Sequence, residues 1–251
     1  MRYKISILIT IVLITFQATA QQFISKGTIE FEVITNVKKT MGNNSFDEQL
    51  KDLMPTFKTA YYNYSFADNK SIFKFDRYEE KKGKLPEFLK RNEDTNEWYS
   101  DFNTGVTYKQ KSIWGSPINF KDSIATIQWK ISNESRVIAG FNCRKATGKI
   151  MDSVYVFAFY TDEITISGGP CSINGLPGMI LGVTIPRLYM SMLATKLTVT
   201  DVKESTIKPL SVKKYYTNKE IKTMLDKRIE DWSADEEGKK YMDQMYWNTF
   251  L

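Results

Sequence analysis

Apolar and polar residues alternate near the start of the chain, which is the pattern of a half-buried β-strand. Ile29, Phe31 and Val33 occupy alternate positions, with polar residues between them. Neighbouring side chains of a strand point to opposite faces, so one face of this segment is expected to meet a core and the other to meet water. Two further runs, 61–66 and 71–75, are joined by a short polar turn and are expected to form a β-hairpin.

Short strand-like runs continue through most of the chain, separated by turns rather than by helical patterns. They cover residues 98–102, 104–109, 113, 118–120, 127–131, 136–139, 141–150, 154–160, 179–185 and 188–199. Strands at this spacing predict an antiparallel meander rather than parallel βαβ units. The polar stretch 79–97 is expected to be a loop.

A short helix is predicted after the first strand. Ser45 and Glu48 form a capping box, in which each side chain bonds the other residue's backbone N–H. Leu50 and Leu53 follow at helical spacing, which indicates an apolar stripe toward the core. Pro55 is expected to end the helix.

The end of the chain also changes to helical periodicity. Thr217 and Glu220 form a second capping box, and a third helix is expected to start within 233–236. Apolar residues at helical spacing follow both starts. These helices, about residues 217–248, are expected to pack on the sheet, with a lid or a membrane-surface helix as the sharper alternative.

The elements together predict a mainly β (α+β) fold, a curved antiparallel β-sheet meander with a short helix after the first strand and C-terminal helices. The first 20 residues have a basic start, an apolar run and the small-residue site Ala18-Thr19-Ala20. This is the pattern of a secretory signal peptide cleaved after Ala20. We therefore expect one exported domain, residues 21–251, periplasmic or secreted, with no transmembrane segment after cleavage.

The absence of histidine narrows the chemistry more than any other feature of the composition. It excludes Ser-His-Asp and Cys-His arrangements and every histidine metal site. The formal net charge of +6 is spread along the chain, with 81–84 as the only basic cluster, so no nucleic-acid footprint is expected. No catalytic residue, metal or cofactor is predicted.

The chain is organised around the stretch Ile166–Val183, which contains a predicted tight turn. The candidate contact residues are Gly175, Leu176, Pro177, Gly178, Met179 and Ile180. Pro177 suits the second position of a type II turn, and Gly178 suits the positive φ of the third. The apolar flanks indicate either a buried structural turn or a loop that contacts a ligand or partner.

Cys143 and Cys171 are the only two cysteines. In an oxidising compartment an even pair is a disulfide candidate, and this bridge would contribute on the order of 3 kcal/mol. The alternative is a pair of buried free thiols. Both alternatives remain open from the sequence.

The stretch around Gly175 resembles the signature of the GLPGLI family of exported bacterial proteins, with Met179 where the family usually has leucine. Segments upstream match in the same order: Trp129-Lys130-Ile131, 138–146 and 158–164. In the last of these, Phe159-Tyr160-Thr161 stands where the family usually has W-Y-T, so Tyr160 joins the candidate contact residues. The resemblance is specific over about 128–183. It implies an exported protein of Bacteroidetes-type bacteria with a largely uncharacterised activity and brings no catalytic residue.

A high aromatic content, with 14 Tyr, 15 Phe and 5 Trp, leaves two functional classes open. A curved sheet could enclose an apolar cavity, as in exported lipoprotein-carrier folds, an analogy of fold only. The protein would then be an envelope binding module for an apolar or small ligand. Alternatively, an exposed aromatic face would dock on an envelope protein, such as an outer-membrane receptor. Asp162 and Glu163 raise a hydrolase with carboxylate chemistry as a third and weaker hypothesis, because adjacent strand residues point to opposite faces.

Overall fold

The computed structural model describes residues 23–42, 45–79, 86, 90, 93–113, 115–199, 202–232 and 236–251. The predicted signal peptide, the basic cluster 81–84 and the predicted start of the third helix at 233–235 lie outside these residues. The side chains of Ser45 and Phe46 are also not described, so the first capping box is untested.

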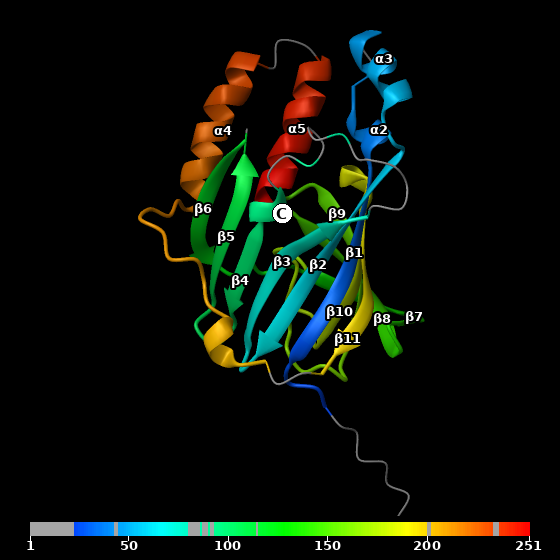
Figure 1. Ribbon diagram of the computed structural model, residues 1–251, viewed down its shortest axis with the longest axis vertical. Coiled ribbons are helices and arrows are strands. Elements are labelled where there is room, and N and C mark those ends of the chain that lie inside the picture. Colours follow the sequence, from blue (N-terminus) through cyan, green and yellow to red (C-terminus); the bar gives the residue numbers. More distant parts are fainter. Residues whose placement is uncertain are drawn as a thin grey trace, which may run out of the picture.

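The described residues form one antiparallel sheet of eleven strands that is not closed into a barrel (Figure 1). The strands are β1 (Gly27–Asn36), β2 (Phe57–Ala67), β3 (Lys70–Tyr78), β4 (Glu97–Asp101), β5 (Val106–Ile113), β6 (Ser116–Ser123), β7 (Trp129–Ile138), β8 (Phe141–Ile150), β9 (Val154–Thr161), β10 (Met179–Ile185) and β11 (Met190–Thr198). Their spatial order is β6-β5-β4-β3-β2-β1-β11-β10-β9-β8-β7. The prediction of a mainly β, antiparallel fold is therefore confirmed.

The meander has one non-local join, at the centre of the sheet. β1 pairs with β2 on one side and with β11 on the other, so that Phe31 lies opposite Tyr62 and Ala194. Every other neighbouring pair is consecutive along the chain. The first and last strands thus tie the two halves of the sheet together.

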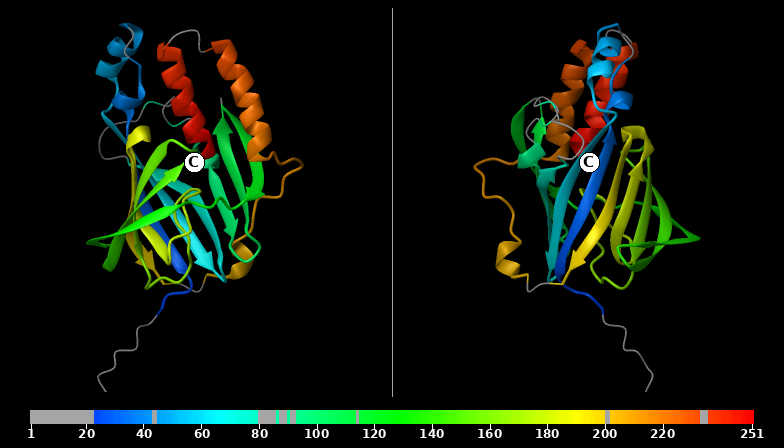
Figure 2. Two further views of the ribbon diagram at one scale, coloured as in Figure 1. Left: turned by 180° about the vertical axis from the view of Figure 1, so that it is seen from behind. Right: turned by 45° about the vertical axis from the view of Figure 1, so that its right-hand side comes forward.

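The short link between the edge strands requires the sheet to curve. Residues 124–128 join Ser123 at the end of β6 to Trp129 at the start of β7. An extended link of this length reaches about 20 Å. The edges of a flat eleven-stranded sheet would be about 48 Å apart. The sheet therefore curls and has a concave face, as the two views in Figure 2 show.

Helices gather at one end of this curled sheet (Figures 1 and 2). They are α2 (Val37–Thr40), α3 (Ser45–Leu53), α4 (Asn218–Trp232) and α5 (Glu236–Phe250). The described residues also form the short 3₁₀ turns η3 (Glu93–Thr95), η4 (Pro186–Leu188) and η5 (Glu204–Thr206), of which η5 lies at the opposite end of the sheet. No helix among the described residues is long and apolar enough to cross a membrane. Leu53 in α3 was expected to face the core and is instead 75% exposed.

The capping box of α4 is present as predicted. The Glu220 N–H donates to Thr217 Oγ1 (3.2 Å), and the Thr217 N–H donates to Glu220 Oε2 (2.7 Å). Ile221 and Leu225 then pack against Phe120 of β6. The same segment protects the edge of the sheet, because the backbone of Tyr216 pairs with that of β6.

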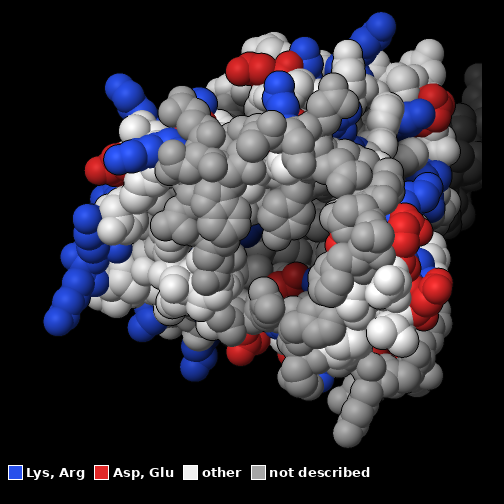
Figure 3. Space-filling model, turned by 90° about the horizontal axis from the view of Figure 1, so that it is seen from above, with Lys and Arg blue, Asp and Glu red and all other residues white. Residues whose placement is uncertain are grey.

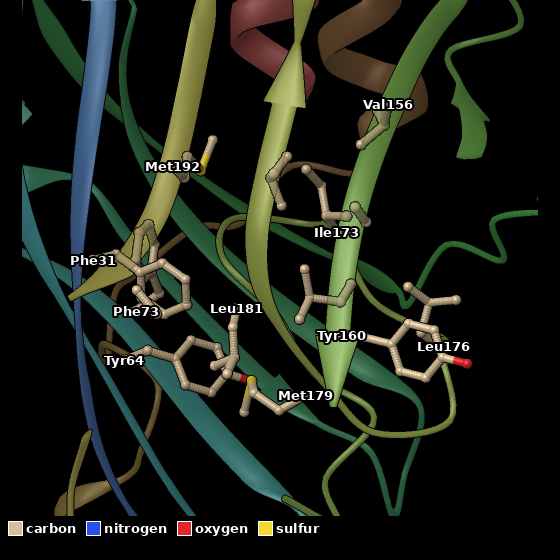
Figure 4. Packing of buried hydrophobic residues seen from close by; sticks show 14 of the residues in the cluster. Phe31, Tyr64, Phe73, Val156, Tyr160, Ile173, Leu176, Met179, Leu181 and Met192 are labelled. Carbon is tan, nitrogen blue, oxygen red and sulfur yellow. The ribbon is translucent and has the colours of Figure 1, made fainter. Parts of the chain in front are cut away.

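The concave face holds the main hydrophobic core. Ile29 and Phe31 are fully buried there, which confirms the alternation predicted for β1. Phe31 meets Phe73 of β3 edge to face, with ring centroids 5.9 Å apart. Figure 4 shows these rings facing Leu181 and Met192 from the other half of the sheet.

The two predicted strands 127–131 and 136–139 are one strand, β7, with a register shift between Ile131 and Ser135.

Candidate ligand cavity

The segment 162–178, between β9 and β10, runs against the concave face and is called the inner loop. Its apolar residues Ile164, Ile166, Ile173 and Leu176 are buried in the main core. Two backbone hydrogen bonds anchor the loop: near its start the Ile24 N–H donates to Glu163 O (2.9 Å), and further along the Ile180 N–H of β10 donates to Gly168 O (2.9 Å). It therefore fills part of the interior that the curved sheet encloses.

The predicted turn lies at the end of the inner loop. Leu176, Met179 and Ile180 are almost completely buried, whereas Gly175 and Pro177 are exposed. Gly178 has the expected positive φ, +133°. Its N–H donates to Leu176 O (2.8 Å), and the Met179 N–H donates to Ile164 O (3.1 Å), so the predicted type II hydrogen bond between Met179 and Leu176 is replaced by a bond to the start of the loop.

A close approach of two backbones explains why glycine stands at 178. A Cβ on Gly178 would lie 2.0 Å from Thr161 O, in the last residue of β9. Tyr160, the residue before, is 2% exposed and lies in the main core. Figure 4 shows the Tyr160 ring beside Leu176. Trp129 covers the same turn, with its Nε1–H donating to Asn174 O (2.9 Å).

Cys143 and Cys171 are both free cysteines in the structure, Cys143 buried and Cys171 half-buried. Cys143 is buried in β8, and its Sγ lies 3.5 Å from Phe141 O. Cys171 is in the inner loop with a left-handed backbone (φ +56°), and its Sγ lies 3.9 Å from Met192 Sδ. Burial raises the pKa of the Cys171 thiol to about 12, so it is protonated at neutral pH.

The C-terminal end of α5 enters the concave face and meets two lysines of β5. Lys109 Nζ donates to Phe250 O (3.2 Å), and Lys111 Nζ donates to Asn248 O. These carbonyl groups carry the negative end of the helix dipole and have no partner within the helix. Trp98 of β4 adds a third bond from its Nε1–H to Leu251 O (3.1 Å).

A cavity of about 450 Å³ remains between α5, the inner loop and the helix end of the sheet. This volume is within the range of small-molecule sites. The described residues that line it are Val33, Thr35, Thr40, Lys58, Tyr62, Phe73, Glu93, Asn96, Trp98, Lys111, Ser112, Ile113, Gly115, Cys171, Met190, Met192, Gln244, Met245, Asn248, Thr249 and Leu251. Its lining is mixed rather than wholly apolar.

The apolar wall of the cavity is rigid and aromatic. Tyr62 stacks on Phe73 with ring centroids 4.8 Å apart, and Trp98 lies against both rings. Met190 and Met192 of β11 add flexible apolar side chains to the lining. Flat rings and flexible thioethers together suit an apolar ligand group of irregular shape.

The polar wall carries charges of both signs. Lys58 and Glu93 form an ion pair, and the Tyr78 hydroxyl also donates to Glu93, at 3.2 Å. From the helix end, the space-filling view shows basic and acidic side chains deep in a hollow near the middle of the face (Figure 3). Lys111 forms no ion pair with the described residues and lies over the Trp98 ring, 5.2 Å from its centroid.

Burial changes the charge state of the two β5 lysines. Burial, together with the smaller effect of the neighbouring charge of Lys111, lowers the pKa of Lys109 to about 7. Burial also lowers the pKa of Lys111. Removing an ammonium from water without a counter-charge is costly, so burial increases the population of the neutral amine.

Gln244 of α5 presents an orphaned acceptor at the cavity wall. Its Nε2–H donates to Arg187 O (2.7 Å), which fixes the orientation of the amide because a carbonyl oxygen only accepts. Its Oε1 is buried and has no hydrogen-bond partner among the described residues. A water or a ligand donor would satisfy this oxygen.

Most of the candidate residues that were named from the sequence lie outside the cavity lining. None of Gly175, Leu176, Pro177, Gly178, Met179, Ile180 and Tyr160 is among the described residues that line it. Cys171, from the middle of the inner loop, does line it. Asp162 is exposed and Glu163 is half-buried at the start of that loop, outside the cavity lining.

Sequence reasoning missed Lys109 and Lys111. The one local signal is their spacing: Lys109, Lys111 and Ile113 alternate along β5 and so share a face with an apolar residue. A lysine in such a pattern is normally assigned to solvent. Their burial depends on the carbonyl groups of α5, about 140 residues later in the chain.

The comparison with family models gives one partial match. A family described as "Protein of unknown function (Porph_ging)" matches residues 148–182, which run from the end of β8 into β10 and include the inner loop. The matched segment overlaps the one that carries the GLPGLI resemblance. It is consistent with a family of Bacteroidetes-type bacteria and does not establish the GLPGLI family itself. No curated protein matches the chain.

The chain is similar to several solved structures at low sequence identity. The chain is similar to PNGF-II in two crystal forms, with a TM-score of 0.50 at 12% identity in one and 0.49 at 13% identity in the other. The matches cover 80% and 79% of this chain but only 32% and 33% of the PNGF-II chain. An uncharacterised conserved protein from Thermus thermophilus matches with a TM-score of 0.37 at 6% identity, over 76% of this chain and 91% of that one. The similarity to the first PNGF-II structure shows that the two proteins share a fold, over about a third of PNGF-II.

Proposed function

We propose that this protein is an exported cell-envelope binding module that holds a small ligand in the cavity of about 450 Å³ beneath α5. The cavity is the observation that carries the proposal. It has the size of a small-molecule site and a rigid aromatic wall, and its polar groups converge from β2, β5 and α5. The mixed lining favours an amphipathic ligand over the wholly apolar one that the aromatic content suggested.

Export is part of the same proposal. It rests on the signal-peptide pattern of residues 1–20 and on the GLPGLI resemblance. Fractionation of cells that produce the full chain tests it directly. We expect the envelope or secreted fraction to contain a product whose mass corresponds to a chain that begins at Gln21. A full-length cytoplasmic product would contradict export.

Native mass spectrometry of the mature protein, purified gently from its own cell envelope, tests ligand binding. We expect a mass above that of the polypeptide alone. Organic solvent should release the added mass. Thr35→Trp should prevent this added mass, because Thr35 lines the cavity and a large ring would occupy it. Ile34→Trp is the matched control, because its side chain is on the opposite face of β1.

A bare polypeptide mass for the wild type would contradict the binding module. It would favour the alternative class, a protein that docks on another envelope component. Equal loading of the Thr35→Trp and Ile34→Trp variants would also contradict the proposal, because the ligand would then lie elsewhere on the molecule.

A further inference from the structure

The two lysines on the concave face of β5 lack a counter-charge. Lys109 and Lys111 each have one hydrogen-bond acceptor among the described residues, a neutral backbone carbonyl of α5. An ammonium group has three donors, so two donors on each lysine remain available. No described carboxylate lies within ion-pair distance of either nitrogen.

The nearest described acid of the cavity is already engaged. Glu93 is paired with Lys58 and accepts a hydrogen bond from the Tyr78 hydroxyl. The thiol of Cys171, another group near Lys111, is protonated at neutral pH. Among the described side chains that line the cavity, two are therefore lysines and one is a carboxylate, and that carboxylate is held by the lysine on β2.

Lys111 also lies at the boundary between the polar and the apolar walls. Its Nζ is above the Trp98 ring, and Trp98 leads directly to Phe73 and Tyr62. A ligand whose anionic end reached Lys111 would thus place its adjoining carbon atoms on the aromatic wall. Met192 and Cys171 line the continuation of that surface.

We propose that the cavity recognises an amphipathic monocarboxylate, with its carboxylate at Lys111 and its apolar body on Trp98, Phe73 and Met192. This inference rests on the proposed function of the cavity. A carboxylate would accept the free donors of Lys111 and supply the missing counter-charge in a water-poor site, where such a charge-assisted bond is strong. An uncharged ligand of the same shape would leave the ammonium without that partner.

The test uses two probes that differ only at the polar end, 4-phenylbutyrate and 4-phenylbutanamide. Calorimetric titration of the mature protein at neutral pH should show the carboxylate binding at least about tenfold more tightly than the amide. Lys111→Met should remove that preference by weakening the carboxylate and leaving the amide unchanged. Lys196→Met, which removes an exposed lysine of β11, is the control and should keep it.

A measurement on the wild type covers the case in which Lys111→Met fails to fold. The preference for the carboxylate should shrink as the pH rises, because the ammonium loses its proton. At a pH where Lys111 is partly deprotonated, binding of the carboxylate should also take up protons, seen as a dependence of the apparent enthalpy on the buffer. Equal affinity of the wild type for the two probes would overturn the inference. An equal loss of affinity for both probes in Lys111→Met would also overturn it.

The outcomes separate this inference from the proposed function. If both probes bind equally and Thr35→Trp abolishes both, the cavity is a ligand site without anion recognition, and only this inference fails. If neither probe binds, the inference fails, and the native mass spectrum alone decides the proposed function.

Discussion

Gly168 lies so close to Tyr64 that a Cβ on the glycine would be 2.0 Å from the tyrosine hydroxyl oxygen. The two residues come from the inner loop and from β2, more than 100 positions apart in the sequence. The next atom of Tyr64, Cζ, would be 3.2 Å away, which a shift of a few tenths of an ångström would relieve. The hydroxyl oxygen is therefore the main obstacle to a side chain at residue 168, where the inner loop lies against β2.

Gly168→Ala should destabilise the protein, and Tyr64→Phe should rescue much of that loss. The extra methyl forces a shift in a packed core, which costs on the order of 2 kcal/mol. Removing the hydroxyl opens the space, so the double variant should be more stable than the sum of the single changes predicts. Denaturant unfolding of the four proteins measures this coupling. Additive free energies of unfolding would show that the contact does not limit the loop.

Gly178→Ala should cost considerably more than Gly175→Ala. Both glycines have positive φ, +133° and +89°. At Gly178 the added Cβ would also meet the backbone of Thr161, whereas at Gly175 its nearest neighbour is Trp129 Nε1, at 3.8 Å. We expect about 1 kcal/mol for Gly175→Ala and several times that for Gly178→Ala. Thermal unfolding checks the order, and equal losses would mean that the turn adapts.

The contribution of Lys109 to the stability of the protein should rise between about pH 7 and pH 10.5. Burial lowers its folded-state pKa to about 7 from the usual value of 10.5. Between these values the unfolded chain binds the proton and the folded chain does not, so unfolding takes up a proton and becomes less favourable as pH rises. Below pH 7 both states are protonated, and the full cost of the buried charge is present.

Lys109→Met should therefore stabilise the protein most below pH 7, by a few kcal/mol, and progressively less as the pH rises. Urea unfolding of the two proteins across this range measures the difference. Lys196→Met, at an exposed site, should not change the pH dependence. A pH-independent difference for Lys109→Met would show that the lysine keeps an ordinary pKa in the folded protein.

Thr217→Ala should destabilise α4 by about 1 kcal/mol. It removes the oxygen that accepts the Glu220 N–H and breaks the capping box. Thr223→Ala is the control within the same helix. Thr223 is exposed there, and alanine has the higher helix propensity, so this change should be neutral or slightly stabilising. Hydrogen exchange at the first turn of α4 should accelerate only in Thr217→Ala, and similar exchange in both variants would rule out the capping role.

The amino-acid sequence determined the local elements because their causes are local. The alternation around Ile29 and Phe31 set which face of β1 is buried, since neighbouring side chains of a strand must diverge. The hairpin between β2 and β3 followed from Asp68 and Asn69, which adopt the positive φ values that tight hairpin turns need. The capping box of Thr217 and Glu220 located the start of α4, because its two hydrogen bonds join residues only three positions apart.

The tertiary structure alone decided the interior. Pairing of β1 with β11 and entry of the inner loop depend on contacts between distant segments, such as Gly168 with Tyr64, which no local pattern encodes. The cavity and its lysines have the same origin. Lys109 and Lys111 are buried because the end of α5 brings backbone carbonyl groups to them, and a strand pattern by itself assigns lysine to water. Local propensity therefore predicted the strands, and long-range packing determined what they enclose.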